Sequence, residues 1–174
     1  MKFCRSVVAI KRSVLLSGMA VMLVAALPAY TAPKGTGLPL PRFVSARANV
    51  INLRTGPGVQ HPVEWVYQRR DLPLEIIAEY RNWRKTRDWQ GALGWIHQSM
   101  LGGRRTFIVT GAKRPLHAKS EENAAVVALL EPGVVGKIVE CPDASDWCQV
   151  SVGAFDGWLQ RRTLWGVYDN EVVR

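Results

Sequence analysis

The sequence lacks the motifs of the common enzyme classes. It contains no Gly-x-Ser-x-Gly nucleophile turn, no His-Glu-x-x-His zinc motif and no phosphate-binding loop. Its three histidines, His61, His97 and His117, lie far apart in the sequence and do not complete a zinc set with a cysteine pair. These absences predict a protein that is not an enzyme and that needs neither a metal nor another cofactor.

A long apolar run is also missing. The longest one, from Val14 to Leu27, has 14 residues, interrupted by Ser17 and Gly18, whereas a membrane span needs about 20. Basic residues precede this run, and small residues follow it, which is the pattern of a secretory signal peptide. We expect a signal peptide over residues 1–29, cleaved somewhere between 26 and 32, and a periplasmic or secreted protein. An uncleaved anchor is the alternative, and it would be the only link to a membrane.

Acidic residues are fewer than basic ones: the chain has 14 aspartates and glutamates against 23 lysines and arginines, which gives a formal charge of +9. Four of the positive charges lie in the expected signal peptide, so the mature chain carries +5. This charge is too moderate for a dedicated nucleic-acid protein, and export argues against that partner. The clustered arginines instead fit an anionic partner such as a cell-wall polymer, with ordinary surface charge as the alternative.

Cysteine is scarce, with three residues in the whole chain. Cys4 lies in the expected signal peptide, which leaves Cys141 and Cys148. An even number of cysteines in an exported chain favours a disulfide, and two free thiols are the alternative. The two residues lie near the mouth of a predicted hairpin between Val134–Glu140 and Trp147–Val152, where a cross-strand bond is possible.

No long segment shows the 3.6-residue period of a helix. Residues 30–41 form a linker rich in Pro and Gly, and short runs of β-forming residues then alternate with turn residues. The candidate strands in the first half are Asn49–Leu53, Leu72–Tyr80, Trp83–Asp88, Leu93–His97 and Arg104–Thr110. Many short strands with frequent turns predict an all-β sandwich or barrel.

The second half repeats the pattern of the first. Gly94-Trp-Ile returns 63 residues later as Gly157-Trp-Leu, and Trp83 returns 64 residues later as Trp147. Leu53-Arg-Thr is matched to Ala118-Lys-Ser at an offset of 65. An internal duplication explains these nearly constant offsets. We expect one domain over 42–109 and a second over 112–169.

The segment Asn49-Val-Ile-Asn-Leu-Arg-Thr-Gly-Pro-Gly58 resembles the opening strand and turn of bacterial SH3 domains. Trp83 and the later Gly94-Trp-Ile resemble the following strands of the same domain, and the pair is similar to short exported bacterial proteins with two such domains. The resemblance implies two tandem SH3-like small β-barrels and a binding role, often towards cell-wall peptides or other proteins. It does not imply binding of Pro-rich peptides, because His97 stands where their groove has a proline.

Aromatic residues are dense in the first barrel, and a domain of this size can hardly bury all of them. Exposed rings would provide a stacking surface for a peptide or a sugar. The candidate ligand-binding residues are Trp65, Tyr67, Tyr80, Trp89 and His97, whereas Trp95 is expected in the core. Two functions remain open. One is recognition of cell-wall peptide or glycan, and the other is a scaffold for envelope proteins with no small ligand.

Overall fold

Residues 35–174 are described by a computed structural model of the chain, and the expected signal peptide lies outside them. The first barrel is built from seven strands and one 3₁₀ helix: β1 (Arg42–Ala46), β2 (Ile51–Arg54), β3 (Val63–Tyr67), β4 (Pro73–Tyr80), β5 (Trp83–Arg87), β6 (Leu93–His97), η1 (Gln98–Met100) and β7 (Leu101–Gly102). The second barrel has the same composition: β8 (Thr106–Val109), β9 (Arg114–His117), β10 (Val126–Leu130), β11 (Val135–Glu140), β12 (Trp147–Val152), β13 (Phe155–Gln160), η2 (Arg161–Thr163) and β14 (Leu164–Trp165). The predicted all-β class is confirmed. Within the described part of the chain, no helix is long and apolar enough to cross a membrane.

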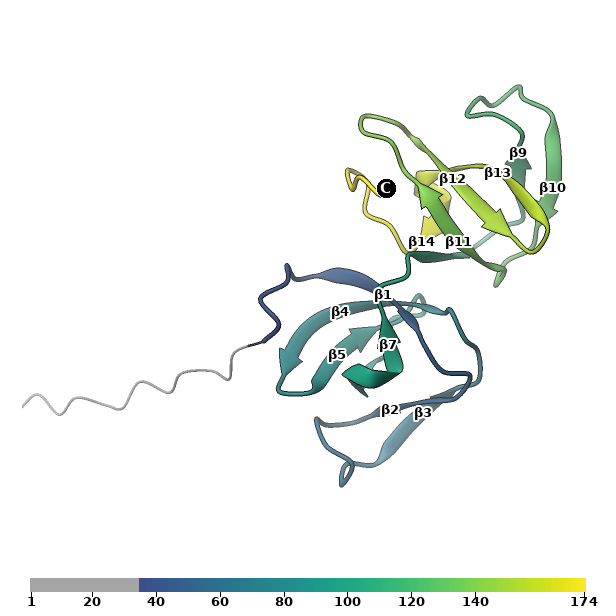
Figure 1. Cartoon of the computed structure of the whole chain (residues 1–174). Helices are drawn as coiled ribbons and strands as arrows, with labels where there is room; N and C mark the ends of the chain where they lie inside the picture. Colours follow the sequence, from purple (N-terminus) through teal and green to yellow (C-terminus); the bar gives the residue numbers. More distant parts are fainter. Residues whose placement is uncertain (1–34) are drawn as a thin grey trace, which may run out of the picture. The chain divides into compact units, whose positions relative to one another are not determined.

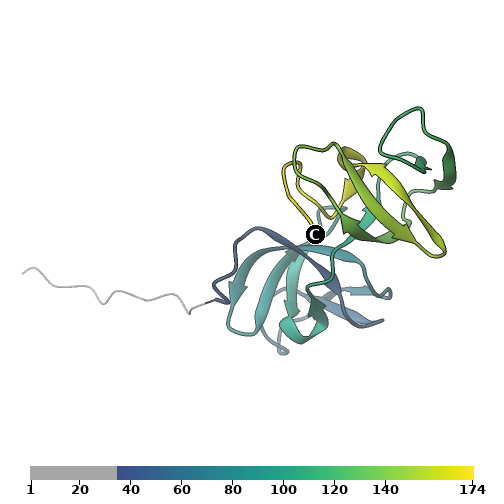
Figure 2. The same ribbon diagram turned by 45° about the horizontal axis from the view of Figure 1, so that its top comes forward.

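Strand order confirms the predicted duplication. The first sheet runs β3-β2-β6-β5-β4-β1-β7, and the second runs β10-β9-β13-β12-β11-β8-β14. Each position in the first order is filled by the corresponding strand in the second, and every pairing is antiparallel. Figures 1 and 2 show the first barrel in blue to teal and the second in green to yellow.

One part of the predicted repeat alignment is wrong. Arg54 pairs with Trp95 in the first sheet, and His117 pairs with Trp158 in the second. Arg54 therefore corresponds to His117 at an offset of 63, and not to Lys119. The sequence match relied on similar side chains in a turn. The structural correspondence between Arg54 and His117 is instead set by the buried leucine that precedes each of them, Leu53 and Leu116.

The boundary between the barrels also differs from the expected one. The segment Thr106–Val109, placed in the first domain by the sequence, forms β8 and pairs with β11 and β14 of the second sheet. All four of its residues are buried. Phe107 and Val109 join the core of the second barrel, while Ile108 joins the core of the first. A strand buried on both faces shows no alternating pattern that would assign it to one domain.

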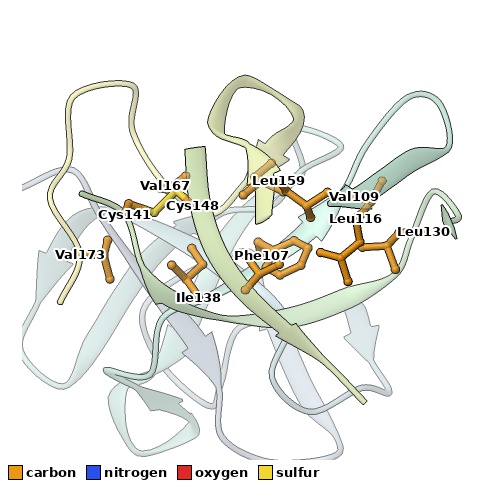
Figure 3. Close-up of a cluster of buried hydrophobic side chains, with 12 residues drawn as sticks. Phe107, Val109, Leu116, Leu130, Ile138, Cys141, Cys148, Leu159, Val167 and Val173 are labelled. Carbon is orange, nitrogen blue, oxygen red and sulfur yellow. A yellow bond between two sulfur atoms is a disulfide. The ribbon is translucent and has the colours of Figure 1, made fainter. Parts of the chain in front are cut away.

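The two cores are filled by the inward-facing residues of the repeated strands. Figure 3 shows Phe107 in the middle of the second core, with the sulfur pair at one end and Leu130 at the other. The expectation that Trp95 is a core residue is wrong, because its neighbours Gly94 and Ile96 are buried and Trp95 points to the opposite face, where it is half-buried. Side chains alternate along a strand, so a core glycine and a core isoleucine force the residue between them outward.

The predicted disulfide between Cys141 and Cys148 is confirmed, with a Cα–Cα distance of 4.2 Å. These residues extend the β11–β12 pairing by one position beyond Glu140 and Gln149. At the corresponding position of the first barrel, Glu79 pairs with Arg84. A covalent link in one repeat therefore occupies the place of an ion pair in the other.

Candidate functional site

A groove of about 360 Å³ opens on the first barrel. It is lined by residues from β2, β5, β6, the loops on either side of β2 and the 3₁₀ helix: Val50, Asn52, Arg54, Val59, Trp83, His97 and Met100. We call this site the aromatic groove. Its walls are mainly apolar or aromatic, and Arg54 is the one residue with a permanent charge among those that line it. This mixture of apolar area and a few polar groups is typical of ligand sites.

Strand alternation places these side chains on the outer face. Along β2, Ile51 and Leu53 are buried in the core, which leaves Asn52 and Arg54 on the opposite face. β6 lies next to β2 in the sheet, and its last residue, His97, also points away from the core. The same alternation that fills the barrel therefore builds the floor of the groove.

Trp83 and His97 form the centre of the aromatic groove. They are direct partners in the β5–β6 pairing, and their rings meet edge to face with centroids 5.4 Å apart. The Nδ1 atom of His97 lies 2.8 Å from the Oγ atom of Ser99. The same nitrogen accepts a 3.4 Å hydrogen bond from the backbone N–H of Ser99, so the imidazole caps the 3₁₀ helix. The orientation of the imidazole is thus fixed from two sides, by the indole and by the helix.

The loop after β2 is held against the groove by Arg54. Its Nη1 atom donates hydrogen bonds to the carbonyl oxygens of Val59, at 3.1 Å, and of His61, at 2.8 Å. Gly56 is needed here because a Cβ atom at this position would lie 2.5 Å from Nδ1 of His61. The guanidinium therefore shapes the rim of the groove before any ligand is present.

Of the five residues predicted to bind a ligand, the structure places His97 in the aromatic groove and the others elsewhere. Trp65 is 55% exposed on the edge strand β3, and Tyr80 is 37% exposed beside Arg81, whose guanidinium lies 5.5 Å from its ring centroid. Trp89 packs partly against the first core. None of these three side chains lines the groove.

Tyr67 lies in the core and is 3% exposed. Its hydroxyl donates a 2.9 Å hydrogen bond to Oδ2 of the buried Asp88, whose Oδ1 accepts from the backbone N–H groups of Gln90 and Ala92. Burial, followed by the charge of Asp88, raises the pKa of the Tyr67 hydroxyl above its ordinary value. The tyrosine therefore anchors the turn between β5 and β6 and offers little surface to a ligand.

Sequence reasoning missed most of the groove, including Trp83, which it placed in a strand, in the repeat and in the family resemblance but not among the candidate ligand-binding residues. The lining residues are spread over 51 positions and come from three strands, the 3₁₀ helix and two loops, so their proximity depends on the pairing of β2 with β6. One signal was available in advance on β2, where Asn52 and Arg54 alternate with the apolar Ile51 and Leu53. On β5 the buried residues are the polar Arg84 and Thr86, so no such pattern marked Trp83.

The second barrel carries hollows at the equivalent place. Trp147 replaces Trp83, Gln160 replaces His97, and Trp147 meets the ring of His117 edge to face at 5.4 Å. A hollow of about 410 Å³ next to Trp147 is larger than the aromatic groove, but charged and amide side chains dominate its lining. The two repeats have therefore kept the tryptophan and diverged in the polarity around it.

Neither described cysteine can act as a thiolate, because both are in the disulfide. Among residues 35–174 there is also no group of three His, Cys, Asp or Glu side chains that could hold a metal ion. The side chains that line the aromatic groove offer stacking, apolar contact and hydrogen bonding.

Comparison with known families identifies the repeated unit. The sequence profile of the bacterial SH3 domain matches residues 47–103 and again residues 112–166. Together these matches cover more than half of the chain, which therefore belongs to the bacterial SH3 domain family and contains two such domains in tandem. Domains of this family are binding modules.

Two solved structures similar to the chain are NlpC1 and NlpC2 from Trichomonas vaginalis. The chain is 9% identical to NlpC1, with 80% of this chain and 50% of that one covered and a TM-score of 0.33. For NlpC2 the identity is 8%, the covered shares are 72% and 48%, and the TM-score is again 0.33. The chain spans about half the length of each. No curated protein matches it.

Proposed function

We propose that this protein is an exported, non-catalytic binding protein whose aromatic groove recognises a peptide of the cell wall. The observation that supports this proposal is the edge-to-face pair of Trp83 and His97 on the floor of a groove of about 360 Å³. A fixed aromatic floor contributes binding energy at a low cost in side-chain entropy, since both rings are already ordered.

The site fits a short, extended ligand. Val50, Val59 and Met100 add apolar walls, and Asn52 offers an amide donor and acceptor at the rim. Stem peptides of a cell-wall polymer combine small apolar side chains with amide groups, which suits these walls. The family membership supports binding, and the disulfide fits an oxidising compartment outside the cytoplasm.

Co-sedimentation with purified, insoluble peptidoglycan tests the proposal. The wild-type chain should sediment with the polymer, and Trp83→Ala should weaken binding by about 1–3 kcal/mol because the stacking surface is lost. Trp65→Ala is the matched control, since it removes an exposed tryptophan of the same barrel outside the groove. Equal loss in both variants, or no sedimentation of the wild type, would count against the proposal.

A protein scaffold is the second candidate, and the edge strand β10 favours it. Val126, Val127 and Leu129 are each at least 40% exposed on this strand, and Phe155 of β13, which lies beyond β9 in the same sheet, is 51% exposed. An uncharged apolar edge is a place where another protein can add a strand. Val127→Lys would abolish such pairing and leave sedimentation with peptidoglycan unchanged.

A further inference from the structure

A second hollow of the first barrel is surrounded by arginines. Arg47, Arg70 and Arg104 line a space of about 240 Å³, together with the end of β1, the segment before β4 and Gly102 of β7. We call it the arginine hollow. The aromatic groove and the arginine hollow share no lining residue.

Backbone hydrogen bonds hold the three segments of the arginine hollow together. The N–H of Asp71 donates to the carbonyl of Ala46 at 2.9 Å, and the N–H of Ala46 donates to Leu72 at 2.9 Å. The N–H of Arg47 donates to the carbonyl of Met100 at 2.8 Å. The arginines therefore extend from a fixed frame, although their side chains are long.

The charge in this hollow is only partly balanced. Asp71 is the single carboxylate that lines it, and its Oδ1 atom lies 3.0 Å from Nη1 of Arg104. Within residues 35–174, the side chains of Arg47 and Arg70 form no ion pair or hydrogen bond. Three guanidinium groups against one carboxylate leave a local charge of +2, and residues 42–105 as a whole carry eleven basic and five acidic residues.

Guanidinium groups match the oxygens of a carboxylate or phosphate with two parallel hydrogen bonds. An anion bound between Arg47 and Arg70 would remove their mutual repulsion. The volume suits one anionic group and not an extended surface, which favours a small charged end of a ligand over a membrane.

The arginine hollow is linked to the aromatic groove by one hydrogen-bonded pair. Met100 lines the groove, Arg47 lines the hollow, and the two residues are joined through their backbones. We propose that the arginine hollow binds a carboxylate of the same cell-wall peptide whose apolar part occupies the aromatic groove. This inference rests on the proposed function. The ligand class is then a stem peptide with a free carboxylate.

Calorimetric titration of the full exported chain with a soluble stem peptide tests this proposal. One form of the peptide carries its free carboxylates, and the other has them amidated. The wild type should bind the free form more tightly. In the double variant Arg47→Gln/Arg70→Gln, affinity for the free form should fall by about tenfold, because charge-assisted hydrogen bonds are lost. Affinity for the amidated form should change by less than about twofold.

The double variant Arg81→Gln/Lys119→Gln is the matched control, since it also removes two exposed positive charges but none from the hollow. It should bind both peptides within about twofold of the wild type. Equal losses in the two double variants would reduce the effect to general electrostatic attraction and overturn the proposal. Circular dichroism on each variant checks that the fold is retained.

Two further outcomes separate the possible failures. Suppose that Trp83→Ala has a lower affinity for both peptides, while Arg47→Gln/Arg70→Gln keeps the wild-type affinity for both. The proposed function then stands, and the carboxylate site is wrong. If the wild type binds neither peptide, both proposals fail. A third arm uses vesicles of phosphatidylglycerol. Vesicle binding that depends on Arg47 and Arg70, without discrimination between the two peptides, would assign the hollow to a lipid phosphate and overturn the proposal.

Discussion

Trp83 and His97 lie directly opposite each other on β5 and β6, and their rings meet edge to face at 5.4 Å. We expect His97→Ala to weaken ligand binding by about 0.5–1.5 kcal/mol, because the indole loses the ring that fixes it. His97→Phe should keep affinity close to that of the wild type, since it keeps an edge-to-face partner. Calorimetric titration measures both. If His97→Ala and His97→Phe lose the same affinity for the ligand, the imidazole nitrogens of His97 contribute to binding and its ring packing does not.

Gly94 packs directly against Leu53, and Gly157 packs in the same way against Leu116. A Cβ atom at position 94 would lie 2.5 Å from Cγ of Leu53 and 2.9 Å from the carbonyl oxygen of Arg54. Gly94→Ala should therefore destabilise the first barrel by about 1–3 kcal/mol. Gly102→Ala, whose nearest neighbours would be 4.0 Å away, is the control and should be nearly neutral. Chemical denaturation compares them, and similar midpoints for the two variants would refute this packing argument.

These glycine contacts explain why the repeat could be predicted from the sequence. Gly94-Trp-Ile and Gly157-Trp-Leu stay alike because each glycine faces a buried leucine, and the residue two positions later, Ile96 or Leu159, enters a core. The loops face solvent and have diverged, so matching Arg54 to Lys119 by residue type gave an alignment wrong by two. The order and type of most strands followed from local pattern, whereas β8 could not be assigned because it is buried on both faces.

The candidate binding surface was less predictable than the fold. Exposed aromatics were expected from their number, and Trp65 and Tyr80 are indeed accessible. Which rings share a concave site depends on the register between β2, β6 and β5, and no local pattern encodes that register. Tyr67 illustrates the difficulty, because its buried bond to Asp88 is formed across 21 positions.

The disulfide between Cys141 and Cys148 closes a short loop at the end of β11 and β12. In the chain-entropy account, Cys141→Ser/Cys148→Ser should lower the free energy of unfolding by about 2.5 kcal/mol. Thermal unfolding of the wild type with a reductant should show the same loss, and the reductant should leave the double variant unaffected. A variant as stable as the oxidised wild type would show that the bond contributes nothing to folding.

The side chain of Glu79 is 5% exposed and meets Arg42 and Arg84, with Thr36 as a further donor. Burial alone raises its pKa, but hydrogen bonds from Arg42 and Thr36 and the charge of Arg84 outweigh it and lower the pKa from 4.5 to about 2. A carboxylate with a depressed folded-state pKa stabilises the fold above its unfolded pKa, and this contribution is lost as the pH falls towards the folded value.

The measurement is the difference in unfolding free energy between the wild type and Glu79→Gln. It should be largest above pH 5 and shrink as the pH falls from 4.5 towards 2. Because the other carboxylates titrate equally in both proteins, the difference isolates Glu79. A constant difference over this range would mean that the ion pairs of Glu79 add no pH-dependent stability.

Export is a separate prediction, based on the basic and then apolar N-terminal segment. Cell fractionation should find the protein outside the cytoplasm, and N-terminal sequencing should place its first residue between positions 27 and 33. A full-length cytoplasmic product would contradict the prediction and would also leave the disulfide without its oxidising compartment.

The central claim is that a cell-wall peptide binds in the aromatic groove of the first barrel. The most direct measurement is an NMR titration of the isotope-labelled exported chain with a soluble stem peptide. We expect amide and side-chain signals of Val50, Asn52, Trp83, His97 and Met100 to shift together and to saturate at one dissociation constant, while those of β10 stay in place. Shifts confined to β3 and β10, or no shifts at saturating peptide, would contradict it.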